Sequence, residues 1–152
     1  MKVYLVFVAL LSVAVAEVAK FSKCEEYSDD ICEVMEVRIT PCKNGKPPCK
    51  LKKGEESRIQ FQFTPQFAAD KLKTGLWWAS DSGDVPFDAF SDVDACLYTG
   101  CPTQPGQKQE LSYGLQLSKL LPNGIFTFKW KLWNTDDVSK GCCFKTEVQL
   151  RK

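Results

Sequence analysis

The sequence predicts an all-β fold, an antiparallel sandwich or barrel. Short segments alternate apolar and polar residues with a period of two, turns rich in glycine and proline separate them, and no segment has a clear helical period. Six or seven strands at this spacing are typical of one antiparallel domain. The chain has no internal repeat and no low-complexity tract.

Three strands are expected in the amino-terminal half. Residues 34–40 alternate before a proline, residues 58–64 carry apolar side chains on one face and polar ones on the other, and residues 76–79 form a short strand with paired tryptophans. Residues 66–73 are the one weak helical candidate, which we expect as a single irregular turn.

Three more strands are expected at residues 111–117, 125–133 and 144–150. In the second of these, four apolar side chains should point inward: Phe126, Phe128, Trp130 and Leu132. Its three polar side chains should point outward: Thr127, Lys129 and Lys131.

The chain opens like a secretory signal peptide. A basic start is followed by a short apolar run that ends in Ala14-Val15-Ala16, and this order is typical of a cleaved leader. The run is shorter than the roughly 20 apolar residues that cross a bilayer. We expect a signal peptide at 1–16, a mature domain at 17–152 and no stable membrane insertion.

The charge pattern argues against two kinds of partner. The formal net charge of +1 becomes zero once Lys2 is removed with the leader, and acidic and basic residues are interspersed along the chain. No nucleic acid and no anionic membrane surface are therefore expected as partners.

Eight cysteines predict disulfides rather than a metal site. The chain has no histidine and no C-x-x-C pair, and the secretory route is oxidising. Eight cysteines allow about 105 connectivities. Cys42 with Cys49 and Cys96 with Cys101 are close enough in sequence to clip local turns. The other four then pair between the amino-terminal region and the end of the chain.

The inward faces carry many large rings. Phe61, Phe63, Phe126, Phe128 and Trp130 alternate on two expected strands. They either fill an aromatic core, the commoner fate of such residues, or hold the sheets apart and line a cavity.

Enzyme chemistry is poorly represented. Without histidine there is no Ser-His-Asp or Cys-His arrangement, and disulfide-bonded cysteines cannot act as nucleophiles. Adjacent acids at Glu25-Glu26, Glu55-Glu56 and Asp136-Asp137 lie beside turns, not as facing carboxylates. No phosphate-binding glycine loop appears. We expect no catalysis and no cofactor.

A set of ordered segments spans the mature chain: residues 21–24, 37–42 and 48–54, Val85-Pro86-Phe87, Asp94-Ala95-Cys96 with Cys101-Pro102, Leu121-Pro122, Trp130-Lys131-Leu132, Cys143 and Val148-Gln149-Leu150. Together these segments resemble the MD-2-related lipid-recognition (ML) family, and most closely its Niemann–Pick type C-2 and mite group 2 allergen members.

The resemblance implies an immunoglobulin-like β-sandwich of two antiparallel sheets with an internal hydrophobic cavity for a lipid. It implies the disulfides Cys24–Cys143, Cys42–Cys49 and Cys96–Cys101, and it leaves Cys32 and Cys142 as a fourth pair. Since Cys142 and Cys143 are neighbours on a strand and point to opposite faces, an exchange of their partners stays open.

By the same resemblance, Phe87, Leu117 and Leu121 guard the mouth of the pocket, and Trp130 is the family tryptophan. The expected ligand-binding residues are Phe61, Phe63, Leu76, Phe87, Leu115, Leu117, Leu121, Phe126, Phe128 and Trp130. Leu121 stands where sterol carriers often have an aromatic residue, so the mouth should be wider.

The expected function is a secreted, monomeric carrier, of the arthropod type, for a fatty acid, sterol or semiochemical. Lysosomal members are sorted by glycans, and this chain has no N-x-[ST] sequon, which favours extracellular fluid over the lysosome. Two other classes stay open. One is a protein-interaction module, such as an innate-immune lipid co-receptor. The other is a carbohydrate-binding module that uses Trp77, Trp78 or Trp133.

Overall fold

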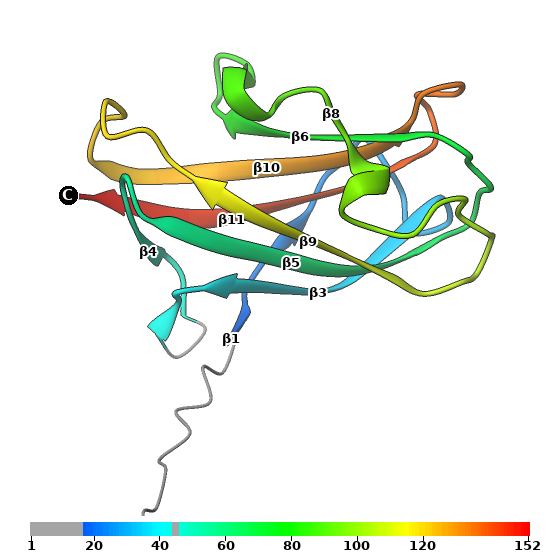
Figure 1. Cartoon of the computed structure of the whole chain (residues 1–152), viewed down its shortest axis with the longest axis horizontal. Coiled ribbons are helices and arrows are strands. Elements are labelled where there is room, and N and C mark those ends of the chain that lie inside the picture. Colours follow the sequence, from blue (N-terminus) through cyan, green and yellow to red (C-terminus); the bar gives the residue numbers. More distant parts are fainter. Residues whose placement is uncertain (1–16, 44–45) are drawn as a thin grey trace, which may run out of the picture.

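The computed structural model describes residues 17–43 and 46–152, and Figure 1 shows them as two facing layers of strands. The predicted signal peptide at 1–16 lies outside the described residues. The strands, in chain order, are β1 (Glu17–Ala19), β2 (Ser22–Lys23), β3 (Cys32–Thr40), β4 (Cys49–Lys52), β5 (Glu56–Pro65), β6 (Leu72–Ala79), β7 (Val85–Pro86), β8 (Val93–Asp94), β9 (Gln109–Gln116), β10 (Gly124–Asn134) and β11 (Gly141–Arg151). Two short 3-10 turns, η2 (Asp88–Phe90) and η3 (Ala95–Leu97), lie between β7 and β9.

The strands form a β-sandwich. The four-stranded sheet has the order β1-β3-β5-β9, and the seven-stranded sheet is built on the order β2-β11-β10-β6-β7. All pairings are antiparallel except the one between β4 and the end of β11. The predicted all-β sandwich of two antiparallel sheets is confirmed.

The six long strands coincide with the six predicted strand segments. Five of them extend beyond the prediction by one to four residues at one or both ends, whereas β9 begins two residues earlier and ends one residue earlier. The helical candidate at residues 66–73 is wrong. Its side chains alternate instead, with Phe67 and Ala69 buried between exposed neighbours, and Ala69 makes a bridge to Thr103. The segment leads into β6 without forming a helical turn, and its buried residues Phe67 and Ala69 are two apart, as in extended chain.

The two sheets meet through aromatic rings. Phe61 on β5 lies with its ring centroid 6.1 Å from that of Trp130 on β10 and 5.1 Å from that of Phe144 on β11. All three side chains are buried. The middle of the sandwich is therefore closed by direct contact between rings from opposite sheets.

Four disulfides fasten the sandwich: Cys24–Cys143, Cys32–Cys142, Cys42–Cys49 and Cys96–Cys101. They are the same four pairs that the resemblance implies. Cys142 and Cys143 point to opposite faces of β11. Cys142 therefore ties the seven-stranded sheet to β3 across the core, while Cys143 holds residues before β3 against the outer face.

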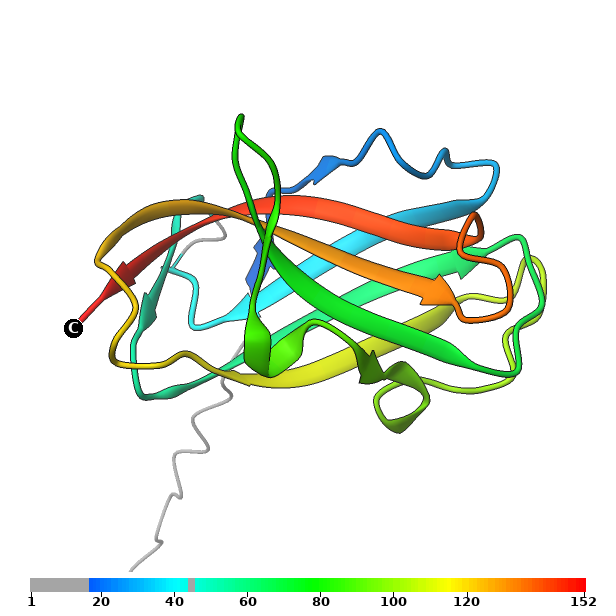
Figure 2. The same cartoon turned by 90° about the horizontal axis from the view of Figure 1, so that it is seen from above.

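That outer face is partly covered. The segment between β2 and β3 runs along β11, as Figure 2 shows from above, and β2 pairs with β11. Lys129 on β10 points outward, as expected, but its side chain is only 7% exposed, because this segment and the turn after β6 flank it. Its ammonium pairs with Glu26 at 2.9 Å and Asp84 at 2.6 Å.

Candidate functional site

The ten predicted ligand-binding residues all belong to or pack against one hydrophobic core. They form two groups along the sandwich. The central group holds residues in the middle of the strands: Phe61, Phe63, Leu76 and Trp130. The end group lies nearer the loop that joins β9 to β10: Phe87, Leu115, Leu117, Leu121, Phe126 and Phe128.

The central group is fully packed. Trp130 donates its indole N–H to the hydroxyl of Thr74 on the adjacent strand at 2.8 Å, which satisfies the polar atom inside the core. Phe90, from η2, lies 4.7 Å from Trp130 and 3.9 Å from Tyr113 between ring centroids. Sequence reasoning missed Phe90, because it lies in a turn without alternation.

Three rings of the end group, Phe87, Phe126 and Phe128, pack with a further ring, Trp78. We call these four rings the end ring cluster. Trp78 lies 4.1 Å from Phe126 and 5.7 Å from Phe87, and Phe87 lies 5.2 Å from Phe128, between ring centroids. Period-two alternation points Trp78 and Phe128 inward. Phe87 reaches them because its backbone N–H donates to the Leu76 carbonyl at 3.0 Å.

Trp78 is a member that the sequence-based site lacked, since the paired tryptophans were considered only as surface residues. Its neighbour Trp77 faces the other side of the sheet. Unlike the central group, the end ring cluster is not wholly buried: Trp78, Phe87 and Phe126 keep part of their surface exposed.

A basic hollow adjoins this end of the sandwich. It measures about 350 Å3 and is lined by four lysines, Lys52, Lys53, Lys119 and Lys152, a set that we call the lysine hollow. It borders the predicted mouth, because the Gly54 N–H donates to the Leu117 carbonyl at 2.8 Å and the Lys53 ammonium donates to the Leu121 carbonyl at 2.5 Å.

Charge in the lysine hollow is only partly balanced. Lys52 pairs with Glu55 at 2.5 Å. Lys53 is 9% exposed and, within the described residues, bonds only to a backbone carbonyl. Lys119 lies against Gly54, whose φ of +81° favours glycine there. A partly buried ammonium without a carboxylate attracts an anion.

In the middle of the sandwich, the space between the sheets is occupied by rings in contact. Four hollows stand out among residues 17–43 and 46–152, and none of them is lined by any of the ten predicted residues. Trp78, Phe126 and Phe128 belong to strands of the seven-stranded sheet, so a guest between the sheets requires this cluster and the four-stranded sheet to move apart. No helix within these described ranges is long and apolar enough to cross a bilayer.

Comparison with known proteins identifies the family. The profile of the ML domain matches residues 18–150. The chain belongs to the ML domain family. It is 49% identical to an MD-2-related lipid-recognition protein of Manduca sexta, with 98% of this chain and 97% of that protein aligned.

More distant relatives agree. This ML domain is 26% identical to NPC intracellular cholesterol transporter 2 of Bos taurus over 95% of this chain and 93% of that protein. Its fold matches a Niemann-Pick type C2 protein from the Japanese carpenter ant with a TM-score of 0.69, at 18% identity, over 87% of this chain and 99% of that one.

Family membership supports lipid binding in general. The relatives named here are a lipid-recognition protein and a cholesterol transporter, and neither name describes an enzyme.

Proposed function

We propose that this ML domain is a secreted, monomeric carrier that holds one apolar small molecule between its sheets, with the chain of the ligand among the end ring cluster. The observation that carries the proposal is the juxtaposition at one end of the sandwich. Partly exposed rings share one hydrophobic core with the leucines that the family resemblance places at a pocket mouth. The lysine hollow lies beside those leucines.

The lysine hollow favours a fatty acid over a sterol as the ligand. A carboxylate head at the mouth would reach Lys53 or Lys119 and replace the backbone carbonyl as the partner of Lys53. Leaving such a head unpaired in an apolar pocket would cost several kcal/mol. A sterol hydroxyl gains less from an ammonium, since it carries no charge and lacks the Coulomb attraction that a carboxylate adds to the hydrogen bond.

Simple partition supplies the driving force. Burying about fifteen methylenes gains roughly 12 kcal/mol, and lost translational and rotational freedom opposes binding by about 4–15 kcal/mol. The favourable limit of this balance, about 8 kcal/mol, corresponds to a micromolar affinity, and we expect modest selectivity for chain length. Any ring contact that the ligand displaces weakens binding by a further ~0.5–1.5 kcal/mol.

Secretion is supported by the leader-like opening of the chain and by the four disulfides, which persist in oxidising compartments. The absence of an N-glycosylation sequon favours an extracellular fluid over the lysosome as the destination.

The pocket is tested with Phe128→Asp, because Phe128 is buried and faces the core from β10. Ile125→Asp on the same strand is the matched control, since Ile125 is 60% exposed on the opposite face. Oleate binding, followed by tryptophan fluorescence, should weaken at least tenfold in the first variant and stay unchanged in the second. A folded Phe128→Asp variant with full affinity would rule out this pocket.

The head-group position is tested with Lys53→Gln, with Lys108→Gln as the control at an exposed position. Lys53→Gln should weaken oleate binding several-fold and leave oleyl alcohol binding unchanged, because only the carboxylate uses the ammonium. Equal effects on both ligands would remove Lys53 from the mouth.

A further inference from the structure

The outer face of the seven-stranded sheet carries a second ring-lined depression, on the opposite side of the sheet from the end ring cluster. We call it the outer groove. It measures about 200 Å3 and is lined by Tyr27, Trp77, Lys131, Trp133 and Val138. Its residues come from three separate stretches of the chain. Tyr27 lies in the segment before β3, Trp77 on β6, and the other three on β10 and the turn that follows it.

Two tryptophans form its floor. The ring centroids of Trp77 and Trp133 lie 5.8 Å apart with their planes inclined at 58°, and the Lys131 ammonium lies 5.0 Å from the centre of the Trp77 ring. Gly75, opposite Lys131 in the β6–β10 register, makes this possible. A Cβ at Gly75 would lie 2.8 Å both from the tip of the Trp77 indole and from the Ser91 carbonyl oxygen, so glycine leaves room for the ring and for the neighbouring backbone.

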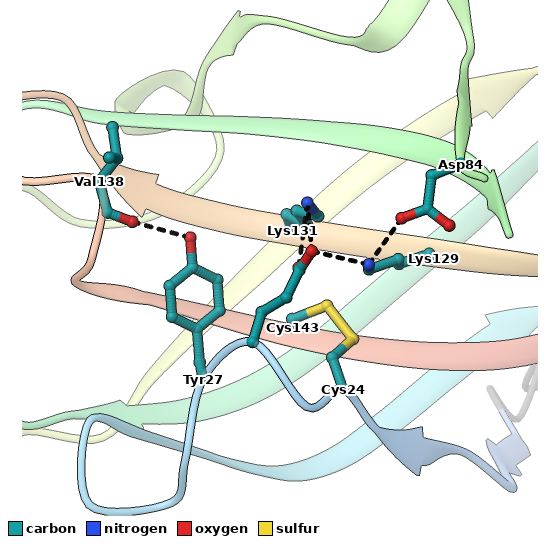
Figure 3. Close-up of polar contacts among 8 residues, drawn as sticks. Cys24, Tyr27, Asp84, Lys129, Lys131, Val138 and Cys143 are labelled. Atoms are coloured by element: carbon teal, nitrogen blue, oxygen red, sulfur yellow. Dashed lines mark hydrogen bonds and ion pairs between the residues drawn. A yellow bond between two sulfur atoms is a disulfide. The ribbon is translucent and has the colours of Figure 1, made fainter.

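The third ring of the outer groove, that of Tyr27, is held by the segment between β2 and β3, which covers part of this face. Tyr27 donates its hydroxyl to the Val138 carbonyl at 3.0 Å and lies over Gly141, where a Cβ would meet its ring at 2.7 Å. Figure 3 shows this bond and the neighbouring Cys24–Cys143 disulfide, which fixes the same segment to β11. The outer groove is thus a platform whose rings are fixed before any ligand arrives.

Charge and hydrogen bonding limit what the platform fits. Lys131 is balanced by Glu26, whose carboxylate accepts a hydrogen bond from it at 3.0 Å. The indole N–H groups of Trp77 and Trp133, in contrast, have no acceptor within the described residues. A neutral ligand with hydroxyl oxygens on its rim and an apolar face would supply those acceptors and cover the rings.

The volume of the outer groove also favours a small ligand. Pockets for drug-sized ligands measure about 300–1,000 Å3, so this groove has room for one small ring and not for a long acyl chain. A pyranose combines an apolar C–H face with a rim of hydroxyls, at the size of one ring. We propose that the outer groove binds a neutral sugar ring of a glycan, stacked on Trp77 and Trp133.

The test follows the indole N–H signals of the isotope-labelled, disulfide-bonded protein by NMR during titration with maltotriose, cellotriose and triacetylchitotriose. At least one trisaccharide should shift the signals of Trp77 and Trp133 saturably, in the millimolar range. The Trp130 signal should not move, because its N–H is buried and bonded to Thr74.

Two variants make the result specific. Trp77→Leu should weaken trisaccharide binding at least fivefold. Ile125→Ser should not, since Ile125 lies on the same face of β10 at its far end. Oleate affinity should be unchanged in both, which separates this proposal from the carrier function.

Three outcomes would overturn the proposal: no saturable shift with any of the three sugars, full affinity in Trp77→Leu, or shifts that depend on protein concentration alone. The last outcome would assign the groove to contact between copies of this chain.

Discussion

Lys129 is a nearly buried charge held by two carboxylates, those of Glu26 and Asp84. Burial alone would lower the pKa of its ammonium, but hydrogen bonds to Asp84 and Glu26, and their negative charges, outweigh burial and raise it. For the Glu26 carboxyl, partial burial would raise the pKa, and the bonds and charges of Lys129 and Lys131 hold it below its ordinary value. The three charges join the segment before β3 to β10 and the turn after β6.

Replacing Glu26 should therefore give a pH-dependent loss of stability. A carboxyl with a lowered folded-state pKa stabilises the fold fully above its ordinary value of 4.5, and this contribution is lost as the pH falls through the lowered value. The difference in free energy of unfolding between wild type and Glu26→Gln should be constant from about pH 6 to 8 and shrink below about pH 4.5. Urea denaturation across this range measures it.

The exposed neighbour Glu25 offers the control, because Glu25→Gln removes the same charge without an ion pair. A Glu26→Gln difference that grows on acidification would contradict the assigned network.

Thr74 is a second residue whose role is specific. Its hydroxyl accepts from the Trp130 indole at 2.8 Å and donates to the Lys131 carbonyl at 2.7 Å. Thr74→Val keeps the shape and leaves a buried indole N–H unsatisfied, which costs about 1–3 kcal/mol. Thr74→Ser keeps the hydroxyl and should cost less than half of that. Equal destabilisation of the two variants in urea titrations would show that the bond is unimportant.

At the scale of elements, two disulfides close almost the same loop. Cys24–Cys143 and Cys32–Cys142 span 119 and 110 residues. Once one of these two disulfides has formed, the other closes only the short loop made of residues 24–32 and 142–143. Loop entropy assigns about 4–5 kcal/mol to the first closure and about 2–3 kcal/mol to the second.

Removing either bridge by a double Cys→Ala change should therefore cost about 2–3 kcal/mol, and removing both about 7 kcal/mol, more than the sum of the single losses. Guanidinium denaturation of the three variants checks this. Additive losses would mean that strain or residual structure, rather than loop closure, sets the contribution of these bridges.

Some elements could be predicted from sequence and others could not, for identifiable reasons. β5 and β10 were predictable, because half-buried strands alternate apolar and polar residues. β7 and β8 have two residues each, too few for any period to be visible. The burial of Lys129 was hidden for another reason: its partners Glu26 and Asp84 are 103 and 45 residues away, and no local pattern records such a contact.

Some parts of the candidate site could likewise be predicted from the sequence and others could not. Alternation predicted the inward rings Phe126, Phe128 and Trp130, and the family resemblance added Phe87. The lysine hollow and the outer groove were not foreseen, since each is assembled from three chain segments that only tertiary packing brings together. The alternative of a filled aromatic core describes the central group, whose rings are in direct contact.

On the scale of the whole molecule, the sandwich combines a rigid middle with a looser end. Phe61 against Trp130 fastens the middle. Cys32–Cys142 fastens the end farthest from the β9–β10 loop, because Cys32 pairs with Pro65, the last residue of β5. The end toward the β9–β10 loop, beside the carboxyl terminus in Figure 1, has partly exposed rings and the lysine hollow. A ligand that enters there need separate only the end of the two sheets, while the fastened middle keeps the fold intact.

The central claim is that an acyl chain lies between the sheets at this end. Photo-crosslinking with oleate that carries a mid-chain diazirine, followed by peptide mapping, tests it most directly. The account predicts labels that unlabelled oleate competes away, on the inward-facing residues of β9, β10 and their connecting loop: Leu115, Leu117, Phe126 and Phe128. Competable labels confined to the outer face, at Trp77 and Trp133, or no competable label at all, would contradict it.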